Sequence, residues 1–356
     1  MAPSLDAHQR PPDHIRAAYK KFQKTRPPAL DADPALVDLV SRDPGAYQLR
    51  LVRSIAREEL LSAFRSFESE TTCSNVEQWL PDTLMPVYEH PSMPGLHIIP
   101  SLFPPEVQKI LLHRLIHRDL SNPSHKTNVH MYYDIPYPPE SSSFFQIPPS
   151  SEPRFLPKDP SIHKPLSINQ FLSKKLRWVT LGGQYDWTNK VYPAEQPPPF
   201  PSDVGSLLEG LFPDMKPQAA IVNFYSPGDT LSMHRDVSEE CDRGLVSVSI
   251  GCDGIFVIGL NEEDSVVDEA SAETQKLPGA LALRLRSGDA VYMSGPSRFA
   301  WHGVPQIVSD TCPSWLQDWP ASPDDRHTDS EKEQLDLWRG WMRTKRINLN
   351  VRQMWD

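Results

Sequence analysis

Between residues 218 and 305, the sequence is dominated by short apolar runs with the length and alternation of β-strands. In GLVSVSI, Val246, Val248 and Ile250 alternate with serines, which is typical of a strand with one buried face. GIFVIGL follows after a Cys-Asp-Gly turn, a spacing that predicts a hairpin of these two strands. LALRLRSGDAVYMSG supplies further strand-like segments. This part of the chain is therefore expected to form a sheet-rich domain.

Short helices and loops are expected elsewhere, because 38 of the 356 residues are proline, which interrupts helices and central strands. The expected elements are a basic amphipathic helix at 14–24, a helix at 54–68, a strand at 95–99 followed by a helix opened by Pro104 and Pro105, a helix from a cap at Ser202 or Asp203, a capped helix in SEKEQLDLWRGWMR and a final strand. Residues 134–166 are crowded with proline and serine and predict a long, irregular, partly mobile loop.

Charge and cysteine content restrict the class of protein. The formal net charge of −10 argues against a general binder of polyanions, so a nucleic-acid partner would need a local basic groove. The four cysteines form no CxxC pair, which suits a reducing compartment. The N-terminus has no apolar signal core and no run of 18 apolar residues occurs, so neither secretion nor a membrane span is expected. We expect an intracellular protein, with nucleus and cytoplasm favoured and the mitochondrion left open.

The segment LSMHRDVSEE places His234 and Asp236 two residues apart. On a strand or extended turn, residues i and i+2 point the same way, so these two side chains can converge on one metal ion. His302, in GPSRFAWHGVP, is the candidate third ligand. Two histidines and one carboxylate form the metal site of non-haem Fe(II) oxygenases. His-x-Asp also arises by chance, and a histidine after an aromatic strand is often a core residue, so an ordinary polar turn stays open as the alternative.

The C-terminal RINLNVRQMW adds a second constraint. Arg346, Asn348, Asn350 and Arg352 are two residues apart and share one strand face. Burying two guanidinium groups is costly without an anionic partner. Arginine binds carboxylates in a planar fork, so a dicarboxylate ligand would explain this face. The alternative is a surface strand with a polar outer side.

Three segments of the sequence together match the motif pattern of one known protein family. The strand IVNFYSPGD places Asn223 and Tyr225 on one face, ahead of the His-x-Asp step. NFYSPGDTLSMHRD, SGDAVYMSGPSRFAWHG and RINLNVR resemble the AlkB family of Fe(II)- and 2-oxoglutarate-dependent dioxygenases, whose pattern is N-x-Y, HxD, a distant His and R-x-N-x-x-x-R. The likeness covers roughly residues 175 to 354, and LRWVTLGGQYDW extends it to the family's nucleotide-recognition region. AAYKKFQKTRPPALD and GLHIIPSLFP are similar to the eukaryotic branch typified by AlkB homologue one.

The resemblance implies an α+β, mainly β fold: a double-stranded β-helix, or jelly roll, with buttressing helices and an N-terminal helical extension. We expect the extension at 1–94, a strand-helix entry with the Pro-rich loop at 95–174, and the dioxygenase domain with its nucleotide-recognition lid at 175–356.

The resemblance also implies the site. His234, Asp236 and His302 would hold Fe(II), with 2-oxoglutarate and O2 as cosubstrates. The 2-oxoglutarate contacts implied are Arg346 on the distal carboxylate, with Asn223, Tyr225, Asn348 and Arg352 in support. Trp178 would stack on a flipped base and Tyr185 would lie in the lid that grips the substrate; a core tryptophan is the alternative for Trp178.

Two features depart from or extend the family pattern. Ser238 stands two residues after Asp236, where the bacterial enzyme has an acid near the base, so its recognition of a base amine does not carry over. An acidic insert at 261–276 is expected to form a solvent loop between the second and third ligands. Near Trp178, the basic Lys174, Lys175 and Arg177 suit a phosphate-tracking edge as well as an ordinary solvated loop.

The function implied is oxidative demethylation of methylated bases in nucleic acid by a protein that is expected to be a monomer and to bind no membrane. A looped tRNA base lowers the cost of unstacking, which favours tRNA, with 1-methyladenosine removal or 5-methylcytidine oxidation, and leaves DNA open. Two alternatives remain: a dioxygenase acting on a protein substrate such as methylated lysine, and a catalytically silent binding protein of the same fold.

Overall fold

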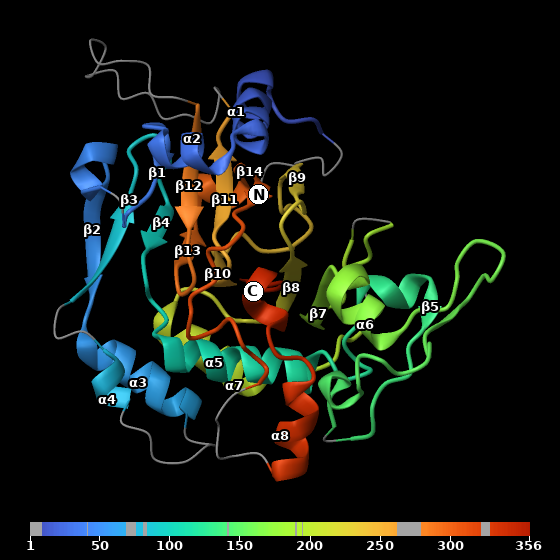
Figure 1. Cartoon of the computed structure of the whole chain (residues 1–356). Helices are drawn as coiled ribbons and strands as arrows, with labels where there is room; N and C mark the ends of the chain where they lie inside the picture. The colour runs from blue at the N-terminus through green and yellow to red at the C-terminus, as the bar shows by residue number, and fades with distance from the viewer. Residues whose placement is uncertain are drawn as a thin grey trace.

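Two β-sheets face each other in the computed structural model of the chain (Figure 1). It describes residues 9–40, 42–68, 76–80, 84–140, 142–188, 191–193, 195–261, 279–321 and 328–356. The larger, eight-stranded sheet has the order β2 (Arg50–Ile55), β3 (Met85–Glu89), β4 (Leu96–Ile99), β13 (Ala290–Met293), β10 (Leu245–Gly251), β15 (Arg346–Arg352), β8 (Ala219–Tyr225) and β7 (Trp178–Gly182). The smaller, five-stranded sheet has the order β1 (Leu36–Val37), β12 (Ala280–Leu285), β11 (Gly254–Gly259), β14 (Trp301–Ile307) and β9 (Leu231–His234).

Most consecutive strands in the second half of the chain alternate between the two sheets; β11 and β12, which pair with each other in the smaller sheet, are an exception. β8 is followed by β9, β10 by β11 and β12 by β13, and each step passes from one sheet to the other. This arrangement is the predicted jelly roll. The hairpin predicted for β10 and β11 is wrong, because the Cys-Asp-Gly turn carries the chain across to the opposite sheet instead of back along the same one.

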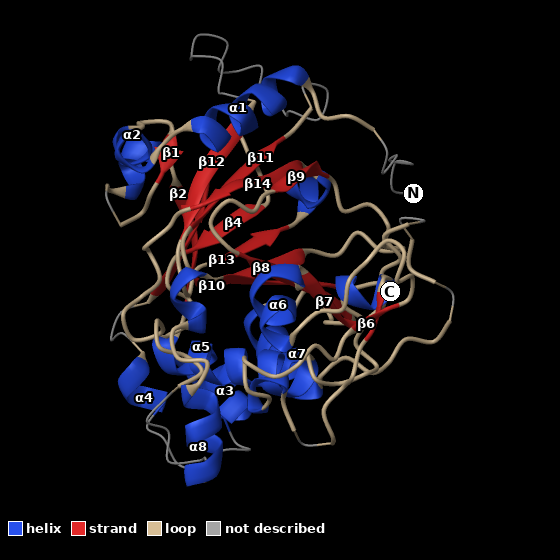
Figure 2. Cartoon of the chain, turned by 45° about the vertical axis from the view of Figure 1, so that its right-hand side comes forward, coloured by secondary structure: helices blue, strands red, loops and turns tan. Residues whose placement is uncertain are grey.

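Helices cover the outer faces of both sheets (Figure 2). Those on the larger sheet include α3 (Arg57–Glu68), α5 (Pro105–His113), its π-helical continuation η2 (Arg114–Asp119) and α7 (Ser202–Leu211). On the smaller sheet, α1 (Asp13–Lys24) packs against β11, β12 and β14 through Ile15, Tyr19 and Phe22. The remaining helices are α2 (Pro27–Ala32), α4 (Val76–Trp79), α6 (Ile168–Gln170), α8 (Asp329–Asp336), η1 (Pro44–Tyr47), η3 (Asn128–Met131), η4 (Phe144–Gln146), η5 (Phe171–Lys175), η8 (Gly295–Phe299) and η9 (Trp341–Thr344).

The first 94 residues contribute strands as well as helices. β2 and β3 extend the larger sheet, and β1 pairs in parallel with β12. The N-terminal part of the expected helix at 54–68 belongs to β2, and α3 begins at Arg57. The division of the chain at residues 94 and 174 stays a prediction.

The alternating strand GLVSVSI is buried on both faces, not on one. All seven residues of β10 are buried, since the strand lies between β13 and β15 in the middle of the larger sheet. Its serines use their hydroxyl groups inside the protein: Ser249 accepts a hydrogen bond from Arg346, and Ser247 accepts one from Asn348. The alternating serines of β10 therefore lie on the face of the strand that is directed toward the space between the two sheets.

Three other expectations differ in detail. The described residues of the Pro-rich segment 134–166 are mostly irregular, with the short helix η4 and a two-residue ladder of β5 (Tyr133–Asp134) with β6 (Leu156–Pro157), but the segment is anchored by buried Phe144, Phe145 and Phe155. α7 begins at Ser202 with Pro201 at the cap position, and Asp203 pairs with Arg118. α8 ends at Asp336, before the basic residues expected in its last turn. Apart from Asn261, the acidic insert at 261–276 lies outside the described residues.

Across the described ranges, no helix combines the length and the apolar character needed to cross a membrane.

Candidate active site

Two histidines face each other across neighbouring strands of the smaller sheet. His234, the last residue of β9, is the register partner of His302 on β14, and their ring centroids are 4.4 Å apart. Asp236 follows just after β9, with its carboxylate oxygens 3.6 Å from His234 Nε2 and 3.9 Å from His302 Nε2. One ligand atom from each of the three residues lies within 4.8 Å of the others. The structure thus brings together the three residues that the sequence singled out.

Backbone carbonyl groups orient both imidazoles. His234 Nδ1 lies 2.9 Å from the carbonyl oxygen of Ser232, and His302 Nδ1 lies 3.1 Å from that of Ala300. Since a carbonyl only accepts, each Nδ1 must donate, which leaves the Nε2 lone pair directed toward Asp236. His302 Nε2 is buried and has no hydrogen-bond partner among the described residues. A buried lone pair of this kind needs a partner, and a metal cation fits it.

The charge states also suit a metal. Burial, with the neighbouring imidazole of His234, lowers the pKa of His302 to about 4, so its ring is neutral at physiological pH. Burial alone would raise the pKa of Asp236, but the positive charges around it, with Arg352 the largest contributor, together outweigh burial and hold that pKa below its usual value. The site therefore presents neutral imidazole and ionised carboxylate together, which is the donor set of a facial Fe(II) site.

A buried ion network supports the aspartate. Arg352 Nη2 lies 3.2 Å from Asp236 Oδ2, and its Nη1 donates to Glu239 at 2.9 Å. Glu239 also accepts from Arg298 at 3.1 Å, while Arg298 donates to the backbone carbonyl of Asp236 at 2.9 Å. The side chains of Arg298 and Glu239 are 0% and 1% exposed. Neither was identified from the sequence, because a single arginine in GPSRF and one of the two glutamates in VSEE form no pattern.

The expected cosubstrate residues lie side by side on the larger sheet. Arg346 on β15 is the register partner of Tyr225 on β8, and Asn348 is the partner of Asn223. Asn348 donates to Ser247 at 2.8 Å and to the carbonyl of Val248 at 3.1 Å. Burial raises the pKa of Tyr225, whose hydroxyl has no hydrogen-bond partner among the described residues.

Arg346 is 2% exposed and is held mainly along one edge of its guanidinium. Its Nη1 donates to the carbonyls of Cys252 and Leu285, each at 3.1 Å, and its Nη2 donates to Ser249 at 2.7 Å. Its Nε has no partner among the described residues. A buried cation with unused donors beside an unused tyrosine hydroxyl fits a carboxylate group.

A cluster of aromatic side chains lies beside the expected cosubstrate residues, at the edge of the larger sheet. Trp178 begins β7 as the register partner of Asn223, and its ring centroid is 5.3 Å from that of Trp187. Tyr185 lies edge-on to Trp187 at 4.9 Å, and its hydroxyl is hydrogen-bonded to Ser238, two residues from Asp236. Trp187, 38% exposed, was not singled out from the sequence, although the QYDW spacing could have indicated it. Of the nearby basic residues, Lys174 and Lys175 are exposed and Arg177 pairs with Asp229.

Comparison with known proteins agrees with this geometry. The profile of the 2OG-Fe(II) oxygenase superfamily matches residues 137–352, more than half of the chain. The chain therefore belongs to this superfamily of dioxygenases, which use Fe(II), 2-oxoglutarate and O2. Within it, the chain belongs to the AlkB homologue one branch, as the sequence motifs predicted.

Three fungal proteins illustrate the relationship. The chain is 48% identical to the N6-methyladenosine RNA demethylase ALKB1 of Pyricularia oryzae, over 98% of both chains. It is 56% identical to the N6-methyladenosine RNA demethylase ALKBH of Cryphonectria parasitica, over 64% of this chain and 100% of that protein. It is 37% identical to the tRNA demethylase abh1 of Schizosaccharomyces pombe, over 75% of this chain and 82% of that protein.

Proposed function

We propose that this dioxygenase oxidatively demethylates methylated adenines in RNA, with tRNA as the favoured substrate. The observation that carries the proposal is the convergence of His234, Asp236 and His302. They lie beside strand β15, with its buried arginines, and beside the aromatic edge formed by Trp178, Tyr185 and Trp187. A silent binding protein would have no need to keep a buried neutral His302, an ionised aspartate and unused buried donors in one place.

His234, Asp236 and His302 are proposed to hold the iron, which when bound activates O2 for oxidation of an unreactive C–H bond while 2-oxoglutarate is decarboxylated. Arg346, with Tyr225 beside it, binds the distal carboxylate of the cosubstrate. Arg352 keeps Asp236 ionised and in place. These residues position the reactants and exclude water; hydroxylation of an N-methyl group gives an adduct that releases formaldehyde.

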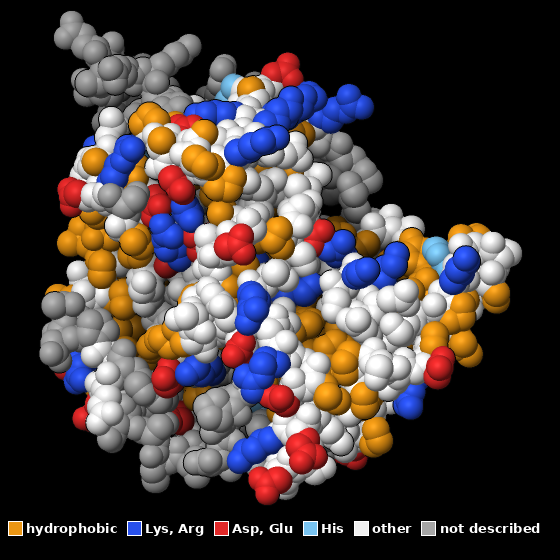
Figure 3. Space-filling model, viewed as in Figure 1, with side chains coloured by type: hydrophobic (Ala, Val, Ile, Leu, Met, Phe, Trp, Pro, Cys, Tyr) orange, Lys and Arg blue, Asp and Glu red, His pale blue; other side chains and the backbone are white. Residues whose placement is uncertain are grey.

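Surface features support a nucleic-acid partner despite the net charge of −10. Lysine and arginine side chains gather on α1 (Figure 3), where Arg16, Lys20 and Lys24 are exposed. α1 packs on β14, which carries His302, so this positive charge lies on the same sheet as the proposed iron site. The relatives named above are described as RNA or tRNA demethylases, and methylated adenine is the base in two of those names.

The aromatic edge suits a base that has left its stack. Trp178 and Trp187 offer flat surfaces of the kind on which unpaired bases stack, and Tyr185 joins them to the segment that carries Asp236. Extruding a paired base costs about a few kcal/mol, which a base in a tRNA loop avoids in part. This difference favours a looped RNA substrate over duplex DNA.

Mass spectrometry of nucleosides tests the proposal. Total tRNA, messenger RNA and DNA are incubated with the purified protein, Fe(II), ascorbate and 2-oxoglutarate, and the methylated nucleosides are quantified before and after. We expect loss of 1-methyladenosine or N6-methyladenosine from RNA, and no loss with a His234→Ala variant. Unchanged methylated adenines in every pool, with succinate still formed when a methyl-lysine peptide is added, would favour the protein-substrate alternative.

A further inference from the structure

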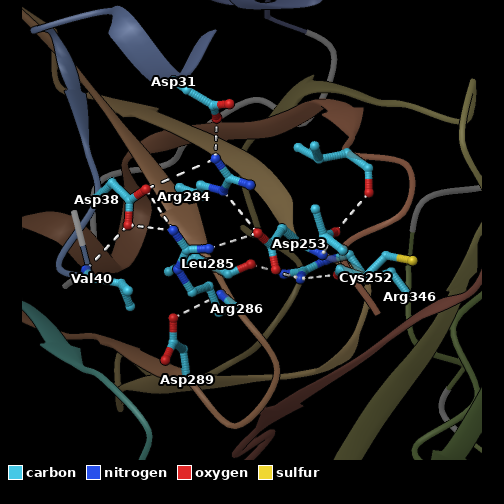
Figure 4. Close-up of polar contacts among 12 residues, drawn as sticks. Asp31, Asp38, Val40, Cys252, Asp253, Arg284, Leu285, Arg286, Asp289 and Arg346 are labelled. Carbon is cyan, nitrogen blue, oxygen red and sulfur yellow. Dashed lines mark hydrogen bonds and ion pairs between the residues drawn. The ribbon is translucent and has the colours of Figure 1, made fainter. Parts of the chain in front are cut away.

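A cluster of charged side chains joins the N-terminal segment to the smaller sheet (Figure 4). We call it the N-terminal clamp and define it as Asp31, Asp38, Asp253, Arg284 and Arg286. Arg286 Nη2 donates to both carboxylate oxygens of Asp38, at 2.7 and 2.6 Å, and Arg284 Nη1 donates to Asp31 at 2.5 Å. Asp253 accepts from Arg284 at 2.8 Å and from Arg286 at 2.9 Å. Asp38 and Asp253 are 7% and 3% exposed, so these two acids are buried in the cluster.

The clamp joins the two chain segments that hold Arg346. Asp253 directly follows Cys252, and Leu285 lies between Arg284 and Arg286. The carbonyl oxygens of Cys252 and Leu285 are the two that accept hydrogen bonds from Arg346 Nη1. The ion pairs of Asp253 with the two arginines therefore fix the separation of those carbonyls, and with it the direction of the Arg346 guanidinium (Figure 4).

The clamp also keeps Asp253 from competing for Arg346. Both arginines bind the same oxygen of Asp253, Oδ2, which satisfies its charge away from the cosubstrate site. Within the described part of the chain, the hydrogen bonds of Arg346 go to neutral groups and to no carboxylate. Without Asp38, Arg286 would keep an ion pair with Asp253 alone among the described residues. A shift of Arg286 would then leave Asp253 paired with Arg284 only, so more of its charge would act on Arg346 in competition with a ligand.

We propose that Asp38, on the N-terminal segment, is a positioning residue for 2-oxoglutarate: through Arg286 and Asp253 it holds Arg346 aligned and unpaired for the distal carboxylate. This inference rests on the proposed role of Arg346. It assigns the N-terminal segment a part in cosubstrate affinity that acts through Arg286 and Asp253.

Binding to the Mn(II)-loaded protein tests this without turnover. Calorimetry measures the affinity of the Asp38→Asn variant for 2-oxoglutarate and for 2-oxopentanoate, which has the same chain length but a methyl group in place of the distal carboxylate. We expect about a fivefold loss of 2-oxoglutarate affinity and an unchanged affinity for 2-oxopentanoate. A Kd for 2-oxoglutarate equal to that of the unmodified protein, or an equal loss for both ligands, overturns the inference. Arg286→Gln is measured in parallel and should show the same selective loss.

Two controls separate the inference from its premise. Asp318→Asn breaks ion pairs of 3.1 and 3.2 Å to Arg339 and Arg343 elsewhere on the surface, and should leave both affinities unchanged. Arg346→Ala should abolish the preference for 2-oxoglutarate over 2-oxopentanoate. If Arg346→Ala has no effect, the proposed cosubstrate site itself is wrong; if only the Asp38 and Arg286 variants have none, the positioning role alone is wrong.

Discussion

His234 and His302 are direct register partners on β9 and β14, with their ring centroids 4.4 Å apart. Strand pairing, not closeness in sequence, therefore sets the geometry between the two imidazoles. The insert that follows β11 can vary in length without moving either ring, because both rings belong to adjacent strands of one sheet. This explains how a long and acidic insertion is compatible with an intact site.

Replacing His302 should abolish metal binding. In His302→Ala, Asp236 and His234 alone remain, and we expect Fe(II) affinity to fall by more than about 100-fold, beyond the effect of losing an outer-sphere partner. Calorimetric titration with Mn(II), used in place of the air-sensitive Fe(II), measures the corresponding loss of metal affinity. His163→Ala, at a histidine that packs against Tyr132 and Tyr133 and is not one of the three grouped ligands, is the control and should bind metal normally.

Replacing Arg352 should destabilise the protein. Arg352→Met leaves the buried carboxylates of Asp236 and Glu239 without that guanidinium, so the free energy of unfolding should fall by about 3–5 kcal/mol. Arg343→Met removes an exposed ion pair to Asp318 and should cost below about 1 kcal/mol. Urea denaturation of the metal-free proteins gives both values, and similar losses in the two variants would contradict the buried network.

Stability of the metal-free protein should decline in mild acid partly because of His302. Its pKa is about 4 in the folded protein, against an ordinary value of 6.5. Between about pH 6.5 and about pH 4, the imidazole of His302 is protonated in the unfolded chain but not in the folded protein. The contribution of His302 to the free energy of unfolding is therefore fully present above about pH 6.5. It is lost as the pH falls to about 4, at about 1.4 kcal/mol per pH unit. Burial lowers the pKa of His90 and His125 in the same direction, so the comparison is with His302→Gln. The variant should lose less stability between about pH 7 and about pH 5, and equal losses would contradict the assignment.

A single methyl group should disturb the cosubstrate anchor. A Cβ on Gly254 would lie 2.6 Å from Arg346 Nε and 2.8 Å from its Cζ, too close for either atom to stay in place. Gly254→Ala should therefore raise the KM for 2-oxoglutarate at least about tenfold, because a shift of about 1 Å in a binding group has large effects. Gly205→Ala, whose Cβ would meet Phe200 at an ordinary 3.6 Å, should leave that KM unchanged.

Removing the Trp187 ring should weaken the binding of nucleic acid without changing the binding of 2-oxoglutarate. Loss of one stacking ring costs about 1–3 kcal/mol per base, so Trp187→Ala should bind methylated RNA roughly tenfold more weakly. The 2-oxoglutarate affinity should not change. Trp315→Ala, at a tryptophan of similar exposure, 37% against 38%, is the matched control in a filter-binding assay. Equal RNA affinity in both variants would contradict a role for the aromatic edge.

The sequence predicted those parts of the site that follow a local period. The two-residue period of RINLNVR defined β15 and its polar face, and the same period paired His234 with Asp236. The strand period does not say which sheet a strand joins, so the turn after β10 was taken for a hairpin. It also cannot tell a solvent-facing serine from one that faces a buried arginine, as Ser249 does.

The supporting residues could not be found in this way, since they act through long-range contacts. Arg298 and Glu239 meet Asp236 only after η8 folds against the segment that follows β9. Asp38 and Arg286, which form an ion pair, are 248 residues apart in the sequence. Buried charges of this kind carry no periodic signal, and only the pairing of the strands reveals them.

The most direct measurement is an anaerobic crystal structure of the protein with Mn(II) and 2-oxoglutarate. The account predicts one metal ion bound by His234 Nε2, the Asp236 carboxylate and His302 Nε2, with the distal carboxylate of the cosubstrate on the guanidinium of Arg346. A metal ion held by other residues, or a cosubstrate whose distal carboxylate does not contact Arg346, would contradict it.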